Sequence, residues 1–218
     1  MIPYKDDNPT YSYPIVTVAL IFLNVAVFVW EGLSPLSDLA LVSRYGAIPY
    51  SLTTFQTIQP ISPITSIFTS MFMHGGLLHL LGNMLYLWIF GDNVEDAMGK
   101  VRFLLFYLLS GVVAVYGHAL SDAESLVPLV GASGAISGVL GAYLMLFPKA
   151  GVKTLVFFGL FWILRIPAFI VIGMWAVVQF LSGAVSAAES QQGGVAWFAH
   201  IGGFLFGLAT VRLWVPRK

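Results

Sequence analysis

The sequence contains no cysteine among its 218 residues. This absence excludes disulfide bonds, thiolate metal sites and cysteine nucleophiles. It does not identify the compartment, because an oxidising environment permits disulfides without requiring them. Charge is scarce and balanced, since 10 Lys and Arg residues face 10 Asp and Glu residues. A chain with zero net charge has no basic field for nucleic acid, and we expect neither a metal ion nor a cofactor.

Apolar residues are abundant, whereas charged residues are few. Hydrophobic residues make up 58% of the chain and charged residues only 9%, and the mean hydropathy is +0.88. Water-soluble domains have roughly a quarter charged residues, so this chain lacks the polar surface that such a domain needs. We therefore expect the lipid bilayer to be its surroundings.

Apolar segments of helical length predict an all-α integral membrane protein with six transmembrane helices in a single domain over residues 1–218. The first segment is not preceded by a basic region and ends in Trp30-Glu31, so we expect a retained helix in preference to a cleaved signal peptide. A long, partly apolar loop over 32–74 separates the first two helices, and we expect it to lie in the membrane interface. The helices are predicted near 14–31, 75–91, 102–121, 133–148, 166–187 and 196–214.

The stretch 150–165 is ambiguous, because its apolar part, 154–164, is too short to cross the hydrocarbon core at about 1.5 Å per residue. We interpret it as an interfacial or re-entrant segment. With six helices, one side of the membrane has a single basic residue, Arg44, and the other side has all the rest: Lys5, Lys100, Arg102, Lys149, Lys153, Arg165, Arg212, Arg217 and Lys218. This asymmetry predicts that both termini are cytoplasmic. If 154–164 were a seventh span, Arg212, Arg217 and Lys218 would lie on the other side and the asymmetry would be weaker.

Polar residues in three of the predicted helices fall at similar depth in the outer half of the bilayer. Ser133 begins the fourth helix, His200 lies about one turn into the sixth, and His79 and Asn83 share a face of the second at i, i+4 spacing. Taken alone, Ser133 could be a small helix contact and Asn83 an interhelical hydrogen bond, whereas histidine inside a membrane is more often functional. Their common depth favours one site.

Glycines indicate how two of these helices approach each other. Gly134 and Gly138 on the fourth helix, and Gly203 and Gly207 on the sixth, follow small-xxx-small spacing, which lets two backbones come close. Close approach would bring the short Ser133 hydroxyl within reach of the His200 ring.

Three motifs resemble those of rhomboid intramembrane serine proteases, most of all the compact six-helix prokaryotic members. Residues 131–134 (Gly-Ala-Ser-Gly) resemble the GxSG motif, the stretch 74–83 resembles the HxxxxHxxxN signature of the second helix, and 199–207 resembles the AHxGGxxxG of the sixth. The resemblance covers roughly residues 14–214. It implies a location in a prokaryotic cytoplasmic membrane, an active site toward the outer face and single-span transmembrane substrates.

The resemblance also implies roles for individual residues. Ser133 and His200 would form a catalytic dyad without an acidic third member, and His79, Asn83 and the backbone N–H of Ser133 would stabilise the oxyanion. His74 would lie at the rim of the site. Substrate would enter beside the fifth helix, and the loop 186–195 could cap the site. The sequence does not indicate an oligomeric state.

Two positions depart from the family pattern. Ser137 stands where many members have an aromatic residue that stacks on the catalytic histidine, and Arg44-Tyr45 is a poor substitute for the Trp-Arg pair of the first outer loop. Two other functions compete with proteolysis. A catalytically silent rhomboid-like scaffold would bind membrane-protein clients, but such relatives usually lack the serine or the histidine. A small transporter would show inverted repeats and ionisable residues near mid-membrane, and the sequence shows neither.

Overall fold

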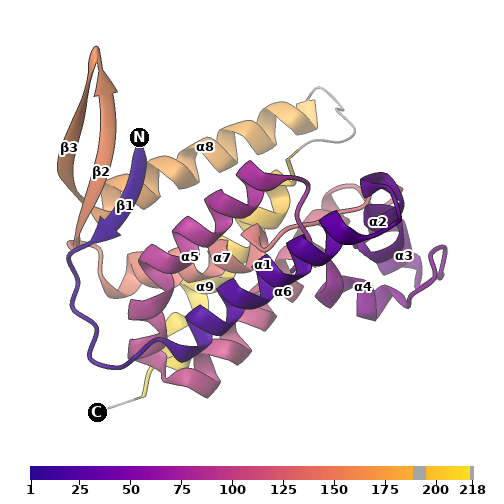
Figure 1. Ribbon diagram of the computed structural model, residues 1–218, viewed down its shortest axis with the longest axis horizontal. Coiled ribbons are helices and arrows are strands. Elements are labelled where there is room, and N and C mark those ends of the chain that lie inside the picture. Colours follow the sequence, from indigo (N-terminus) through magenta and orange to yellow (C-terminus); the bar gives the residue numbers. More distant parts are fainter. Residues whose placement is uncertain (189–194, 217–218) are drawn as a thin grey trace.

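The computed structural model describes residues 1–188 and 195–216. Figure 1 shows the long helices packed side by side, with a small sheet and both termini at one end and the short helices at the other. The helices of this part of the chain are α1 (Ile15–Leu33), α2 (Asp38–Tyr45), α3 (Pro49–Thr54), α4 (Pro63–Ser70), α5 (Leu77–Met98), α6 (Lys100–Ser121), α7 (Ser133–Leu146), α8 (Ala168–Ala188) and α9 (Trp197–Trp214). The strands are β1 (Ile2–Asp6), β2 (Gly151–Phe158) and β3 (Leu160–Pro167).

The fold is mostly helical, as the sequence predicts, and α1, α5, α6, α7, α8 and α9 coincide with the six predicted segments to within a few residues at most boundaries. The predicted 75–91 differs most, because α5 continues to Met98. Within the described ranges, α1, α6 and α8 are long and apolar enough to cross a membrane, and α7 is a shorter apolar helix of 14 residues. The count of six spans remains a prediction.

The sheet is the one departure from the all-α expectation. Residues 150–165, interpreted from sequence as an interfacial or re-entrant segment, form most of the antiparallel hairpin β2–β3, and β1 pairs with β2 in the order β1-β2-β3. β-branched and aromatic residues favour strands, and Gly159 makes the tight turn with a φ of 70°. Asp7 joins β1 to the hairpin through ion pairs with Arg165 (2.5 Å) and Lys153 (3.6 Å).

Two carboxylates near the end of α5 anchor the start of α1. The buried Glu95 side chain accepts hydrogen bonds from the backbone N–H groups of Val16 (3.0 Å) and Thr17 (2.7 Å) and from the Thr17 hydroxyl (2.8 Å). Asp96 accepts from Ser12 in the same way. The first N–H groups of a helix have no partner inside it, and a carboxylate there also complements the helix dipole. These acidic residues therefore fix α1 against α5.

Helix α7 lies in the centre of the bundle. Residues 134–143 are all buried, and large aromatic side chains of α5 and α6 pack around them: Phe90, Phe103, Phe106 and Tyr107. Inside a bilayer such side chains hold helices together by close van der Waals packing, so this core holds the helix that begins with Ser133.

The segment between α1 and α5, predicted as a long outer loop, contains the three short helices α2, α3 and α4. Ala47, Leu52 and Ile67 of this segment form a second apolar cluster with Val115 and Ala119 of α6. The segment is therefore packed onto the bundle, at the end opposite the sheet (Figure 1).

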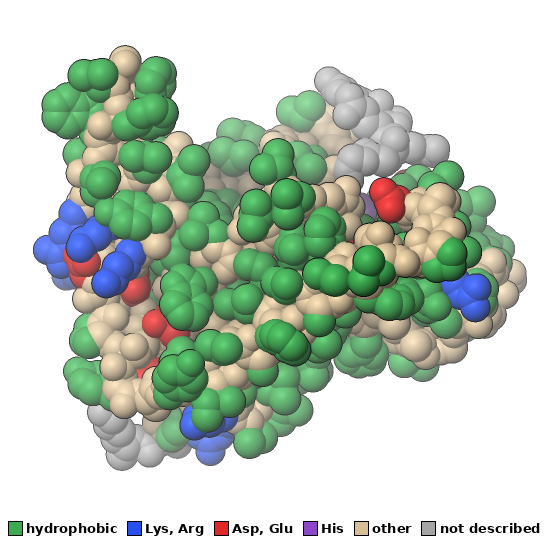
Figure 2. Space-filling model, viewed as in Figure 1, with side chains coloured by type: hydrophobic (Ala, Val, Ile, Leu, Met, Phe, Trp, Pro, Cys, Tyr) green, Lys and Arg blue, Asp and Glu red, His purple; other side chains and the backbone are tan. Residues whose placement is uncertain are grey.

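Charged side chains are also distributed unevenly between the two ends of the molecule. In Figure 2, basic groups gather at the end that has the sheet and the termini, a smaller basic spot marks the opposite end, and hydrophobic side chains cover much of the middle.

Candidate active site

Ser133 is the first residue of α7, at the end of a loop that glycine makes possible. Gly131 has a φ of 131°, a backbone conformation that residues other than glycine rarely adopt. Its N–H donates to the Ser70 carbonyl at 2.8 Å, which fixes the loop against the end of α4. The first N–H groups of α7 have no intrahelical partner, so Ser133 stands beside free donors and the positive end of a helix dipole.

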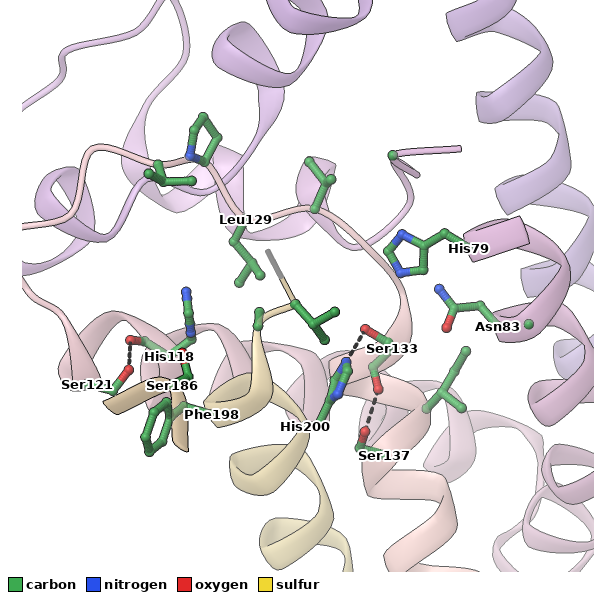
Figure 3. A pocket seen from close by; sticks show the side chains of 18 of the residues that line it. His79, Asn83, His118, Ser121, Leu129, Ser133, Ser137, Ser186, Phe198 and His200 are labelled. Carbon is green, nitrogen blue, oxygen red and sulfur yellow. Dashed lines mark hydrogen bonds between the residues drawn. The ribbon is translucent and has the colours of Figure 1, made fainter. Parts of the chain in front are cut away.

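The Ser133 hydroxyl contacts His200 of α9. The distance from Ser133 Oγ to His200 Nε2 is 2.7 Å, a good hydrogen-bond length. Figure 3 shows the two side chains meeting across the gap between their helices. The contact expected between these residues, which are 67 positions apart in sequence, is thus present.

Glycine makes this contact possible. A Cβ atom on Gly203 would overlap the carbonyl oxygen of Gly134, and one on Gly207 would overlap that of Gly138. α7 and α9 therefore meet backbone to backbone, as small residues at a helix crossing allow. The separation of the two helices, and with it the position of His200 relative to Ser133, is set by main-chain contact.

His79 and Asn83 reach the same place from α5. Figure 3 shows both side chains pointing toward Ser133 from one face of that helix. A Cβ atom on Gly131 would lie only 2.8 Å from His79 Cε1 and 2.9 Å from Nε2. The missing side chain at Gly131 thus leaves room for the His79 ring beside the serine. The structure brings together all four residues that the sequence singled out.

His74 is not at the rim of the site, which corrects the position expected from sequence. Its side chain is only 5% exposed and lies behind Asn83. The Asn83 amide donates to His74 Nε2 at 2.9 Å, and His74 Nδ1 donates to the Phe72 carbonyl at 3.2 Å. Burial lowers the pKa of His74 to about 4, so the ring is neutral near pH 7 and keeps a lone pair for Asn83. Sequence spacing placed this residue near the site but could not give the direction of its ring.

Three residues around His200 were not anticipated from the sequence. Gln179 Oε1 lies 2.7 Å from His200 Nδ1, and the rings of Trp175 and Trp197 have their centroids 6.1 and 6.2 Å from the imidazole centroid. Aromatic contact with His200 thus comes from α8 and α9. Ser137 instead donates its hydroxyl to the Ser133 carbonyl at 2.6 Å. The lone amide of Gln179 in an otherwise apolar segment was the available signal, since polar residues inside membrane helices are commonly functional.

A cavity of about 1010 Å³ opens over these residues. Its lining includes His79, Asn83, Ser133 and His200, together with His118 near the end of α6. Most of the loop 186–195, expected as a cap, lies outside the described residues, but Ser186, Ala187 and Val195 at its two ends line the cavity. Within the described ranges, no group of three or more His, Asp or Glu side chains is placed to hold a metal ion.

Comparison with known proteins identifies the family of the chain. The Rhomboid domain family model matches residues 62–217. The chain is similar to Rhomboid protein 1, mitochondrial, of Saccharomyces cerevisiae (30% identity; 87% of this chain and 50% of the yeast protein). It is also similar to Rhomboid protease GluP (45% identity; 65% of this chain and 25% of that protein) and Putative rhomboid protease YdcA (40% identity; 36% and 39%), both of Bacillus subtilis. The chain thus spans half or less of the length of these relatives. A family model that covers most of the chain shows that this protein belongs to the rhomboid family.

Proposed function

We propose that this protein is an intramembrane serine endopeptidase that cleaves transmembrane segments with a dyad of Ser133 and His200. The observation that carries the proposal is the 2.7 Å contact between Ser133 Oγ and His200 Nε2, at the wall of a large cavity. A hydroxyl hydrogen-bonded to an unprotonated imidazole nitrogen is the arrangement of an activated serine nucleophile. The names of the two Bacillus relatives, Rhomboid protease GluP and Putative rhomboid protease YdcA, support the same activity.

The reaction follows from the positions of the two side chains. His200 Nε2 takes the hydroxyl proton as Ser133 Oγ attacks the peptide carbonyl carbon, and it then gives that proton to the leaving amine. The acyl group stays on Ser133 as an ester. Water admitted through the cavity attacks the ester, again with His200 as the base, and releases the second product with the serine restored.

Negative charge on the substrate oxygen is stabilised from the α5 side of the cavity and from the start of α7. Asn83 has a second amide hydrogen that is not committed to His74, and His79 lies beside the serine. The backbone N–H of Ser133 adds a donor at the positive end of a helix. Each well-placed donor contributes about 3 kcal/mol of transition-state stabilisation.

We extend the proposal to topology and substrate. Residues 1–218 would form one membrane domain with six spans and a cytoplasmic sheet and termini, and the charge distribution in Figure 2 supports this orientation. Ser133 would then face the outer half of the bilayer. Single-span substrates would enter past α8 and unwind locally, because a regular helix hides its carbonyls. The Bacillus relatives favour a prokaryotic cytoplasmic membrane, whereas the yeast relative makes a mitochondrial membrane the competing location.

A fluorophosphonate probe tests the nucleophile. The wild-type protein should be labelled covalently, and Ser133→Ala should not be labelled. Ser137→Ala is the matched control, because this serine lies one turn further along the same helix and donates to a backbone carbonyl; it should be labelled at close to the wild-type rate. Labelling of Ser133→Ala would overturn the proposal.

A further inference from the structure

Gln179 is a buried amide on α8 that the dyad chemistry described above does not use. It is 6% exposed, and it lies one turn after Trp175 on the same face of the helix. Both side chains contact His200. An uncharged polar side chain in such an apolar helix is costly unless its hydrogen bonds are satisfied, and the partners of this one are specific.

The orientation of the Gln179 amide follows from its second hydrogen bond. The Nε2 group donates to the Trp175 carbonyl at 3.3 Å. Turning the amide over would place Oε1 against that carbonyl oxygen, where two acceptors repel each other. The oxygen of Gln179 therefore faces His200, at 2.7 Å from Nδ1.

This orientation selects one form of the His200 ring. Gln179 Oε1 has no hydrogen to donate, so the hydrogen of the neutral imidazole must reside on Nδ1. Nε2 is then unprotonated and presents its lone pair to the Ser133 hydroxyl at 2.7 Å. The rings of Trp175 and Trp197 confine the imidazole, but an apolar wall does not distinguish one ring nitrogen from the other.

We infer that Gln179 is a positioning residue that holds His200 in the tautomer and orientation needed to accept the serine proton. In this role its amide oxygen occupies the place that a carboxylate has in a three-residue triad. The amide accepts the same Nδ1–H when the ring becomes an imidazolium, and a hydrogen bond from a charged donor is stronger than one from a neutral donor. The inference rests on the proposed function, because it assigns a role toward the proposed base.

The competing role for Gln179 is to hold α8 against α9. Two readouts separate the roles. Attack by Ser133 on a small fluorophosphonate needs the dyad but no lateral entry of a substrate helix, whereas cleavage of a transmembrane substrate needs both. A residue that acts only through helix packing would change cleavage and leave the rate of labelling unchanged.

The experiment compares Gln179→Leu, Gln179→Met and Gln179→Glu with Val178→Ala as the control. Val178 is the neighbouring residue, about 100° further round the helix, and is 52% exposed. We expect the two apolar variants to lose at least tenfold in both the labelling rate and kcat, by similar factors and with KM within about twofold. Gln179→Glu, which keeps an acceptor of the same length, should restore most of the labelling rate, and Val178→Ala should match the wild type.

Labelling at the wild-type rate in folded Gln179→Leu or Gln179→Met would overturn the inference. Glutamate that fails to restore the rate lost in the apolar variants would also overturn it. These failures are distinct from failure of the proposed function. If only the role of Gln179 is wrong, Ser133→Ala still abolishes labelling. If the proposed function is wrong, Ser133→Ala is labelled like the wild type.

Discussion

Two of the contacts that α9 makes, the one with α7 and the one with α8, differ in kind. Toward α7 it meets backbone, since Cβ atoms on Gly203 and Gly207 would overlap carbonyl oxygens. Toward α8 it meets side chains: a Cβ atom on Gly183 would lie 3.2 Å from the end of Ile201, and Trp175 packs on Phe204 with ring centroids 5.8 Å apart. Much of the α8 surface is free in the described chain, and Val177 is 56% exposed.

This difference indicates which wall of the cavity can move. Main-chain contact between α7 and α9 allows one separation, so the geometry of Ser133 and His200 is fixed in advance. Side-chain contact can rearrange through rotamers, and a loosely packed helix opens at lower free-energy cost than a tightly packed one. These contacts support our proposals that a substrate helix enters past α8 and that Gln179 is the group through which the position of α8 reaches the dyad.

The largest effect is expected at the contact between α7 and α9. Gly207→Ala places a methyl group on the Gly138 carbonyl oxygen, which cannot move without its helix. We expect a loss of about 3 kcal/mol in the free energy of unfolding, at the upper end of overpacking costs, together with loss of fluorophosphonate labelling. Thermal denaturation in detergent measures the first effect. Wild-type stability in this variant would show that α7 and α9 are not held by backbone contact.

On the α5 side of the cavity, a substitution should change the rate of catalysis more than the stability of the fold. Asn83→Ala removes a donor to the oxyanion, and we expect kcat to fall by about 100-fold, which corresponds to about 3 kcal/mol. His74→Ala is the matched control, because it breaks the same hydrogen bond between His74 and Asn83 but leaves the amide in place. It should lower kcat by less. Equal losses in the two variants would argue against a direct role for Asn83.

The pH dependence of the free energy of unfolding should show the titration of the buried His74 on the α5 side of the cavity. Its pKa is lowered from 6.5 to about 4 in the folded protein, so the unfolded chain binds more protons between these values and stability falls as the pH falls through this window. The slope approaches at most about 1.4 kcal/mol per pH unit. His74→Gln keeps a partner for Asn83 but does not titrate. The difference between its denaturation profile and that of the wild type should grow below pH 6.5, and parallel profiles would refute the assignment.

The smallest effects are expected on α8. A Cβ atom on Gly183 meets the flexible end of Ile201, and one on Gly173 has no atom within 4 Å. Gly183→Ala should change the free energy of unfolding by less than about 1 kcal/mol, and Gly173→Ala should raise it by up to about 1 kcal/mol through helix propensity. Losses as large as that of Gly207→Ala would erase the distinction between the two faces of α9. The same thermal denaturation measures all three variants.

Much of this arrangement could be predicted from residue spacing. Hydrophobic runs indicated the six long helices, and glycines four residues apart on α7 and α9 indicated that the two backbones would approach. The contact between Ser133 and His200 follows from these features and is present. Its catalytic role, like the six-span topology, remains a prediction.

Other features depend on tertiary packing that spacing does not encode. The apolar run 154–164 has no helical period of its own, and a short apolar run is compatible with a strand or a helix; its pairing with β1 decides the outcome. The contact of Gln179 with His200 depends on how α8 is rotated against α9. His74 differs from its expected place because ring direction is set by Phe72 and Asn83, which sequence alone cannot show.

The decisive experiment is cleavage of a single-span transmembrane substrate by the purified protein in liposomes. We expect cleavage by the wild type and by Ser137→Ala, and at least about 10³-fold slower cleavage by Ser133→Ala and by His200→Ala, since removal of either member of the dyad stops the same step. Cleavage by Ser133→Ala at the wild-type rate would show that Ser133 is not the nucleophile. A folded wild-type protein that neither cleaves the substrate nor reacts with fluorophosphonate would show that the protein is not a serine protease.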